Sequence, residues 1–185
     1  MRPRQAGSLA LAGLLSLIAC TAREVPGAPV ATTTAIAPDW VLDAASLGRF
    51  RTGITLAEFN AQLGEQLVPA YEISSTCDHV DPASFPEGVI VMIENDSVAR
   101  FDVENPAVRT REGAGVGDLE TDVVRRYAGS ISVAPHAYTG PDGHYLTVTP
   151  PGDTLHRIIF ETDGKKVLHI RAGKRPAVDY IEGCA

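Results

Sequence analysis

The chain has 185 residues, enough for one well-packed domain or two very small ones. Acidic residues outnumber basic residues by 23 to 16, and the formal net charge is −7 at pH 7. Nucleic-acid-binding proteins need basic surfaces, so this composition argues against a nucleic-acid partner. The aromatic content of 6% also gives little support to a small-molecule pocket.

Residues 1–19 have the composition of an export signal. Arg2 and Arg4 supply a positive N-terminal region, and residues 9–18 form an uncharged apolar run that is short for a membrane span. We therefore expect residues 1–19 to be a signal peptide that is removed. Its removal takes away two basic residues, which makes the mature chain still more acidic.

Cys20 follows this segment at a position suited to lipid attachment. Leu17 lies three residues before Cys20, and the small residue Ala19 directly precedes it. This arrangement resembles a bacterial lipoprotein signal, which implies diacylglycerol on the Cys20 thiol, cleavage before Cys20 and an acyl chain such as palmitate on the new amino group. In the lipoproteins that this segment resembles, an aspartate after the cysteine favours inner-membrane retention, so the resemblance and Thr21 imply, for a Gram-negative cell, an outer-membrane anchor facing the periplasm. An ordinary secretory signal that contains a cysteine is the alternative.

Residues 20–39 are rich in Ala, Thr and Pro, carry few charges and show no helical or alternating period. This composition is typical of a flexible tether between an anchor and a folded domain. Trp40, which is followed by two apolar residues, marks the expected start of that domain. The domain is therefore expected to span residues 40–185.

A first helix is predicted within residues 53–64. Thr55 can cap its N-terminus, and Glu58, three residues later, can complete a capping box. Gly64 follows the last apolar residue of this segment and is expected to end the helix.

A second helix is predicted between Asp118, as its N-terminal cap, and Gly129, as the residue that ends it. A hairpin is predicted after each helix, at residues 89–103 and at residues 157–172. Because the helix and its hairpin recur at similar spacing, the sequence indicates that one unit has been duplicated.

Alternating polarity predicts further strands at residues 71–76, 130–134 and 144–149. We therefore expect an α+β fold in which two tandem repeats, each a helix plus an antiparallel hairpin or sheet, pack as one domain. Each sheet should cover its helix with one face and leave the other face partly open. The expected divisions are repeat one at about residues 50–108, repeat two at about residues 109–173 and a C-terminal tail at residues 174–185.

This tandem unit resembles the β-lactamase inhibitory protein family and the related small outer-membrane lipoproteins of the β-barrel assembly machinery. The resemblance rests on Gly-Ile-Thr-Leu-Ala-Glu-Phe at residues 53–59, on Leu63 and Gly64, and on a looser copy at residues 115–129. It covers nearly all of residues 50–173. It implies a module that holds another protein on an open sheet and has no catalytic residues of its own.

Cys77 and Cys184 are the remaining thiols once Cys20 carries lipid. In an oxidising envelope two such cysteines usually pair, and their bond would tie the C-terminal tail to the first repeat. A reactive thiol is the alternative, but Asp78 and Glu182 beside these cysteines disfavour a thiolate. We therefore predict a structural disulfide.

His136, Asp142 and His144 lie close together in the sequence and could form an acid–base or metal site. Their spacing matches no strong metal-binding pattern, and the chain has no motif for a nucleophilic serine. The glycine-rich residues 113–117 are followed by acidic residues, which disfavour phosphate at a helix N-terminus. We therefore predict no catalytic residues, no metal and no cofactor.

The Pro- and Gly-bounded loop at residues 136–145 should form the rim of an open sheet. Tyr138, His144 and Tyr145 offer rings of the kind that is enriched at protein interfaces, and Arg171 on the following hairpin could face outward and add a charge contact. These four residues form the predicted interaction surface. The alternative is that Tyr145 points inward and fills the core.

The favoured hypothesis is a lipid-anchored protein-binding module of the cell envelope, either a component of an assembly or an inhibitor of an envelope enzyme. The duplicated unit and the acidic charge favour it. Its expected partners are the membrane, through the lipid on Cys20, and an envelope protein. A small-ligand-binding lipoprotein and a hydrolase that uses His136, His144 and Asp142 are the alternatives.

Overall fold

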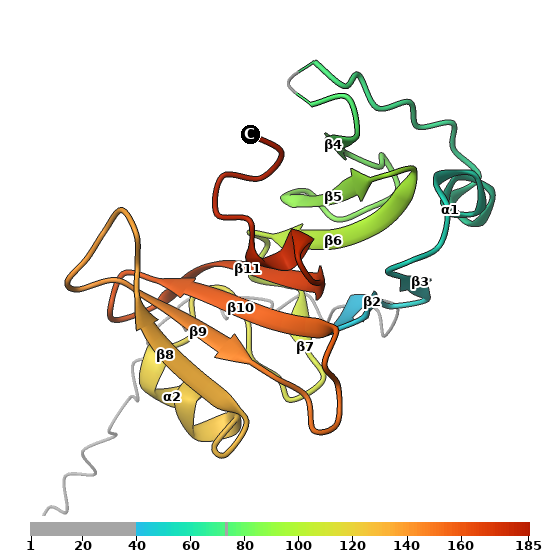
Figure 1. Ribbon diagram of the computed structural model, residues 1–185. Coiled ribbons are helices and arrows are strands. Elements are labelled where there is room, and N and C mark those ends of the chain that lie inside the picture. Colours follow the sequence, from blue (N-terminus) through green and yellow to red (C-terminus); the bar gives the residue numbers. More distant parts are fainter. Residues whose placement is uncertain (1–39, 73) are drawn as a thin grey trace, which may run out of the picture. The chain divides into compact units, whose positions relative to one another are not determined.

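The computed structural model describes residues 40–72 and 74–185, which belong to one structural unit, Thr34–Ala185 (Figure 1). The predicted signal peptide, Cys20 and the predicted tether lie outside the described residues. No helix in the described part is long and apolar enough to cross a membrane. The elements in chain order are β1 (Val41–Asp43), β2 (Ser46–Leu47), β3 (Phe50–Arg51), α1 (Leu56–Leu63), β4 (Cys77–Val80), β5 (Val89–Glu94), β6 (Ser97–Val103), β7 (Arg109–Thr110), α2 (Glu120–Arg126), β8 (Ile131–Pro135), β9 (His144–Val148), β10 (His156–Thr162), β11 (Val167–Lys174) and the 3-10 helix η2 (Ala177–Asp179).

A large antiparallel sheet has the strand order β4-β5-β6-β11-β10-β9-β8 (Figure 1). β6 and β11 pair directly, with Val103 opposite Ile170 and Arg100 opposite Gly173. These strands end the two predicted repeats, so the expectation of one sheet for each repeat is wrong. Each hairpin instead supplies the pairing partner that the edge strand of the other hairpin needs. Two α-helices and two sheets in the described part fit the α+β class.

A small second sheet, with the strand order β3-β2-β1-β7, was not predicted. β1 pairs antiparallel with β2 and parallel with β7, so it connects the first described residues to the segment that follows β6. Its strands are only two or three residues long, and such short strands show no alternation in sequence. Leu42, Leu47 and Phe50 of this sheet are buried.

α1 forms where the first helix was predicted. The Thr55 hydroxyl accepts a hydrogen bond from the Glu58 backbone N–H at 3.2 Å, and the Glu58 carboxylate accepts one from the Thr55 N–H at 2.9 Å. Gly64 at the C-cap has a φ of 76°, which glycine adopts without steric cost. The predicted capping box and helix end are confirmed.

α2 begins later than predicted, and no side chain caps its N-terminus. The predicted Asp118 cap is wrong because its carboxylate accepts hydrogen bonds from the Arg109 guanidinium at 2.7 Å and from the Gly115 N–H at 3.1 Å. The helix also ends earlier than predicted. Its C-cap is Tyr127, and Gly129 lies in the turn that follows.

Both predicted hairpins are present. β5 and β6 are joined by Asn95 and Asp96, whose φ angles of 49° and 59° suit the tight turn between twisted antiparallel strands. β10 and β11 form the second hairpin, with a register shift after Glu161. β8 and β9 confirm the strands predicted at residues 130–134 and 144–149, within one residue at each end.

The strand predicted at residues 71–76 is wrong, because the described residues of this range form no strand and β4 begins at Cys77. The Asp78 carboxylate accepts hydrogen bonds from the backbone N–H groups of Ala70 at 2.6 Å and Tyr71 at 2.9 Å. These bonds hold the preceding segment beside β4 instead of letting it extend the strand.

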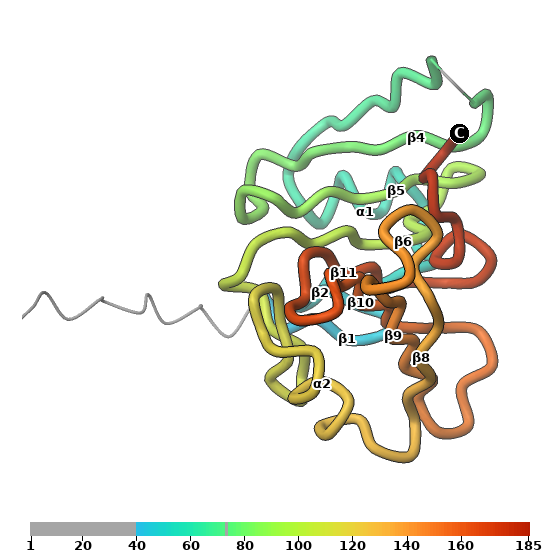
Figure 2. Tube along the Cα trace, turned by 90° about the vertical axis from the view of Figure 1, so that its left-hand side faces the viewer, coloured from blue at the N-terminus to red at the C-terminus, as the bar shows by residue number. Residues whose placement is uncertain are grey.

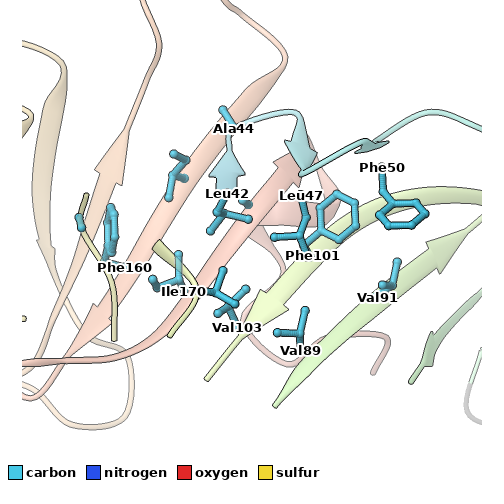
Figure 3. Close-up of a cluster of buried hydrophobic side chains, with 14 of the residues drawn as sticks. Leu42, Ala44, Leu47, Phe50, Val89, Val91, Phe101, Val103, Phe160 and Ile170 are labelled. Atoms are coloured by element: carbon cyan, nitrogen blue, oxygen red, sulfur yellow. The ribbon is translucent and has the colours of Figure 1, made fainter. Parts of the chain in front are cut away.

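One face of the large sheet packs against both helices and the small sheet. Phe59 of α1, Val123 of α2 and Leu42 of β1 belong to the same buried cluster as the inward side chains of the large sheet. Figure 3 shows the small-sheet side chains lying over the hairpin strands from both predicted repeats. The labelled members of this cluster are Leu42, Ala44, Leu47, Phe50, Val89, Val91, Phe101, Val103, Phe160 and Ile170.

Candidate functional site

The large sheet has a second face that points away from this core. Because successive residues of a strand alternate between faces, the buried Phe101 is flanked by two charged residues that point to the other side. We call this second face the open face. It carries Ile90 and Met92 of β5, Arg100 and Asp102 of β6, His169 and Arg171 of β11, Glu161 of β10 and Tyr145 of β9.

Asp102 lies among three basic side chains on the open face. Its carboxylate accepts a hydrogen bond from Arg100 Nε at 2.9 Å, while His169 Nε2 lies 3.3 Å and His79 Nε2 lies 4.0 Å from its oxygens. Burial alone raises the pKa of Asp102, but the bonds from His169 and Arg100 outweigh that effect and lower it. Asp102 is therefore a buried carboxylate that stays ionised at neutral pH.

Glu161 is the second carboxylate of this network. Its oxygens lie 3.2 Å from the Arg171 guanidinium, 3.1 Å from His136 Nε2 and 3.4 Å from His169 Nδ1. Burial alone raises the pKa of Glu161, but the His169 hydrogen bond and the Arg171 charge lower it to about 2. The network therefore joins β6, β11, β10 and the loop after β8.

His169 connects the two carboxylates because one ring nitrogen faces Asp102 and the other faces Glu161. Burial alone lowers the pKa of His169, but these two bonds raise it to about 9, so the ring is an imidazolium at neutral pH. An imidazolium with both nitrogens occupied is a poor metal ligand. No group of three His, Cys, Asp or Glu residues that could hold a metal ion occurs among the described residues.

Arg171 lies on the open face but is only 2% exposed. Its NH1 donates a hydrogen bond to the Tyr180 carbonyl at 2.7 Å, and its guanidinium lies 5.6 Å from the Tyr145 ring centre. Burial lowers the pKa of Arg171, and its Nε has no hydrogen-bond partner among the described residues. The prediction that Arg171 faces outward to contact a partner is wrong, because residues that follow β11 cover it.

We call residues 175–185 the strap. The Arg100 guanidinium donates hydrogen bonds to the Ala177 carbonyl at 2.9 Å and to the Tyr180 carbonyl at 2.8 Å. At the end of the strap, Cys184 forms a disulfide with Cys77 of β4, with a Cα–Cα distance of 5.4 Å. The predicted pairing is therefore confirmed. Figures 1 and 2 both show the C-terminus beside β4, so the strap crosses from the central strand β11 to the edge of the sheet formed by β4.

The predicted rim loop connects β8 and β9. Tyr138 at its tip is 65% exposed, and its hydroxyl donates a hydrogen bond to the Glu182 carboxylate of the strap. Behind it, the His136 ring stacks on Tyr145 with ring centres 4.4 Å apart. Tyr145 is therefore half-buried on the open face, and the alternative that it fills the core is wrong.

His144 lies on the opposite side of the sheet from this rim. Its Nδ1 is 3.0 Å from the Glu120 carboxylate of α2, on the side that packs against the core. Because His144 and Tyr145 are consecutive in β9, their side chains cannot share a face. The prediction that His144 joins Tyr138 and Tyr145 in one interaction surface is therefore wrong.

The hydrolase alternative requires His136, His144 and Asp142 to lie close together in space. His136 pairs with Glu161 on the open face, whereas His144 pairs with Glu120 on the core side. No hydrogen bond or ion pair joins Asp142 to either histidine among the described residues. The three residues therefore do not converge on one reaction centre.

Two hollows flank the covered part of the open face. One groove, of about 600 Å³, lies along the strap and reaches Tyr138. The other, which we call the free hollow, has a volume of about 260 Å³ and lies on the part of the face that the strap does not cover. Burial lowers the pKa of His79, which lines the free hollow together with the imidazolium of His169. The free hollow is lined by His79, Gly88, Ile90, Arg100, Asp102, Glu104 and His169.

The sequence interpretation missed most of the charged network. Arg100 and Asp102 alternate with the apolar residues of β6, and that period of two could have placed them on one exposed face. The pairing of Asp102 with His169 depends on the contact between β6 and β11, for which the sequence gives no local signal. No family model, curated protein or solved structure matches this chain.

Proposed function

We propose that this chain is a lipid-anchored protein of the cell envelope that binds another protein on its open face. The observation that carries the proposal is the charged network from Arg100 to His136. Hydrogen bonds hold its side chains in place on the open face, and part of that face remains uncovered. A face whose side chains are already held in place loses little conformational entropy when a partner docks.

Apolar side chains beside the network favour a protein partner over a small ligand. Ile90 is 36% exposed at the free hollow, and Tyr138 and Ile181 are 65% and 45% exposed along the groove beside the strap. Interfaces between proteins commonly combine such apolar and aromatic contacts with polar groups. The free hollow is small and carries no excess of one charge, which gives weaker support to a dedicated small-molecule site.

The chemistry of the partner follows from the charge of the chain. The excess of acidic residues attracts a partner whose contact surface is basic. Glu104 at the free hollow and Glu182 on the strap are exposed carboxylates that could meet such charges at the rim. The proposed partner therefore presents apolar side chains flanked by lysine or arginine.

Membrane attachment through Cys20 is part of the same proposal. The lipoprotein-like signal supports it, and the stretch of residues 21–38 within the tether would have a root-mean-square span of roughly 20 to 25 Å. Such a tether would let the open face reach partners near the membrane without fixing its orientation. A Cys20→Ser variant should leave precursor or a species that no longer partitions with membranes. Normal processing and membrane binding of that variant would exclude the anchor.

An internal duplication is also part of the proposal. Each α-helix is followed by a hairpin, and Phe101 in the first hairpin and Ile170 in the second are both fully buried in the same core. This order supports the resemblance to the β-lactamase inhibitory protein family and the small assembly lipoproteins. By that resemblance, the protein serves as an assembly component or as an inhibitor of an envelope enzyme.

Site-specific photo-crosslinking in the native envelope tests the docking face. A photoreactive residue at Ile90 should capture a partner, whereas the same residue at Val68, which is 84% exposed in the loop after α1, should not. The captured protein should then bind the purified full chain, and Ile90→Lys should weaken that binding while Val68→Lys leaves it unchanged. Equal capture at both positions, or binding that ignores Ile90→Lys, would place the interface elsewhere.

A further inference from the structure

β8 is an edge strand of the large sheet and is strongly exposed. It pairs on one side with β9, and Ser132, Val133, Ala134 and Pro135 are all exposed. No described residue pairs with its other side. An unpaired strand edge is a ready template for another strand.

The hydrogen bonds at the two ends of β8 show which backbone groups point outward. The Thr149 N–H donates to the Ser130 carbonyl at 2.9 Å, and the His136 N–H donates to the Gly143 carbonyl at 2.8 Å. In an antiparallel pair, bonding to the neighbour alternates along the strand. The even-numbered residues of β8 therefore bond to β9, and the odd-numbered residues turn their backbone groups away from it.

These outward groups are unusually unprotected. The sequence of β8 is Ile-Ser-Val-Ala-Pro, which contains no charge, and natural edge strands are commonly blocked by lysine, proline or a covering segment. The opposite edge, β4, has such cover because Asp78 holds the N–H groups of Ala70 and Tyr71 beside it. In β8 the only blocking residue is Pro135, at the very end.

We propose that β8 pairs antiparallel with β8 of a second copy of this chain, about a twofold axis at Val133. In this register the two Val133 residues exchange both of their backbone hydrogen bonds. Each Ile131 N–H then donates to the Pro135 carbonyl of the second copy. Proline lacks an N–H, but here its carbonyl alone is needed as an acceptor, so the blocking residue does not prevent this pairing.

The side chains of β8 match themselves in this register. Val133 lies opposite Val133 of the second copy, Ser132 opposite Ala134, and Ile131 opposite Pro135. All three kinds of pair are uncharged, so no like charges face each other although the chain as a whole is acidic. An edge that avoids every charge in an acidic protein is complementary to itself.

The expected dimer is weak. A contact confined to a strand of five residues buries far less than the roughly 1,200–2,000 Å² of a standard stable interface. We therefore expect a Kd on the order of 0.1–1 mM for the full chain. The inference does not rest on the proposed docking function, because it concerns the edge of the sheet and not its open face.

Sedimentation velocity of the full chain in mild detergent, over a wide range of protein concentration, tests the dimer. Val133→Lys puts like charges opposite each other at the axis, and Val133→Pro removes the central donor without breaking a bond to β9. Each variant should weaken association by at least about tenfold. Val68→Lys is the matched control, because it makes the same change at an exposed valine in the loop after α1.

The proposal predicts concentration-dependent dimers for the unchanged chain and for Val68→Lys, and monomers for both Val133 variants under the same conditions. A chain that stays monomeric up to millimolar concentration overturns it. Dimers that persist in both Val133 variants, or that Val68→Lys weakens equally, overturn it as well. The two Val133 variants act through different groups, so a folding defect in one leaves the other informative.

Discussion

Cys77 and Cys184 are bonded although they lie 107 positions apart in the sequence, and this bond fixes the free end of the strap. The other end of the strap continues directly from β11. Between these two points, the buried guanidiniums of Arg100 and Arg171 use strap carbonyls as hydrogen-bond acceptors. The disulfide therefore maintains the hydrogen bonds of two buried charges as well as the position of the tail.

Replacing Cys184 with serine should destabilise the domain. The chain-entropy model gives up to about 4–5 kcal/mol for a loop of this length, and measured effects are often smaller. Thermal unfolding of the purified full chain should show a lower Tm for Cys184→Ser. The unchanged chain treated with reductant should unfold near the same temperature as the variant, and the variant itself should not respond to reductant. Equal Tm values for the oxidised chain and the variant would contradict a stabilising role for the bond.

The stability of the domain should fall at alkaline pH because of His169. Its pKa is raised to about 9 in the folded state from an ordinary value of about 6.5. The stabilising contribution is therefore complete below about pH 6.5 and is lost as the pH rises toward 9. We expect a loss on the order of 2–3 kcal/mol over this range, measured by denaturant unfolding at a series of pH values.

A His169→Gln variant is the control for this pH dependence. Glutamine keeps hydrogen-bonding capacity but does not titrate, so the fall in stability between pH 6.5 and 9 should largely disappear. Glu161 should show the opposite pH dependence, because its pKa is lowered to about 2 in the folded state. Its ionised carboxylate stabilises the fold fully above about pH 4.5, and this contribution is lost as the pH falls to about 2. An alkaline loss that persists unchanged in His169→Gln would assign it to another group.

Neutralising Glu161 should be costly, because the substitution leaves three basic side chains without their shared carboxylate. Glu161→Gln is expected to lower the free energy of unfolding by about 2–4 kcal/mol. The pKa of His169, followed by NMR, should fall as well. Glu104→Gln is the matched control, since Glu104 lines the hollow that His169 also lines but is itself exposed. Similar losses in the two variants would mean that the network does not depend on Glu161.

Local sequence signals were sufficient for much of the secondary structure. Thr55 and Glu58 were sufficient to predict where the first helix starts, and Asn95 and Asp96 were sufficient to predict the turn of the first hairpin. Both features depend on residues only a few positions apart in the sequence. The Asp118 cap failed because a carboxylate that can cap a helix can equally bind a nearby guanidinium. The choice between Arg109 and the helix N-terminus depends on the small sheet, which positions Arg109.

The candidate site was harder to predict because it is assembled from distant strands. Arg100 and Glu161 belong to one network only because β6 pairs with β11 and β11 with β10. Residues that bear charge on alternating strand positions indicate an exposed face, but they do not indicate which strands are neighbours. The strap adds a further step, since it covers Arg171 with residues that follow it in the chain.

The rim offers the sharpest test of the docking face, because two aromatic residues of the β8–β9 region occupy opposite sides of the sheet. Tyr138 is exposed and contacts the strap through its hydroxyl, whereas His144 pairs with Glu120 of α2. Tyr138→Ala should therefore weaken binding of the photo-captured partner by more than about 1 kcal/mol and leave Tm almost unchanged. His144→Ala should do the reverse, with a loss of stability of about 1 kcal/mol and unchanged affinity.

Tyr138→Phe separates the ring from its hydroxyl. If the ring makes the contact, Tyr138→Phe should bind nearly as well as the unchanged chain, because only the hydrogen bond to the exposed Glu182 is lost. If the hydroxyl positions the strap for the partner, Tyr138→Phe should resemble Tyr138→Ala in affinity measured by titration calorimetry. Unchanged affinity in both Tyr138 variants, together with weakened affinity in His144→Ala, would move the docking surface from the open face to the side of the sheet that carries α2.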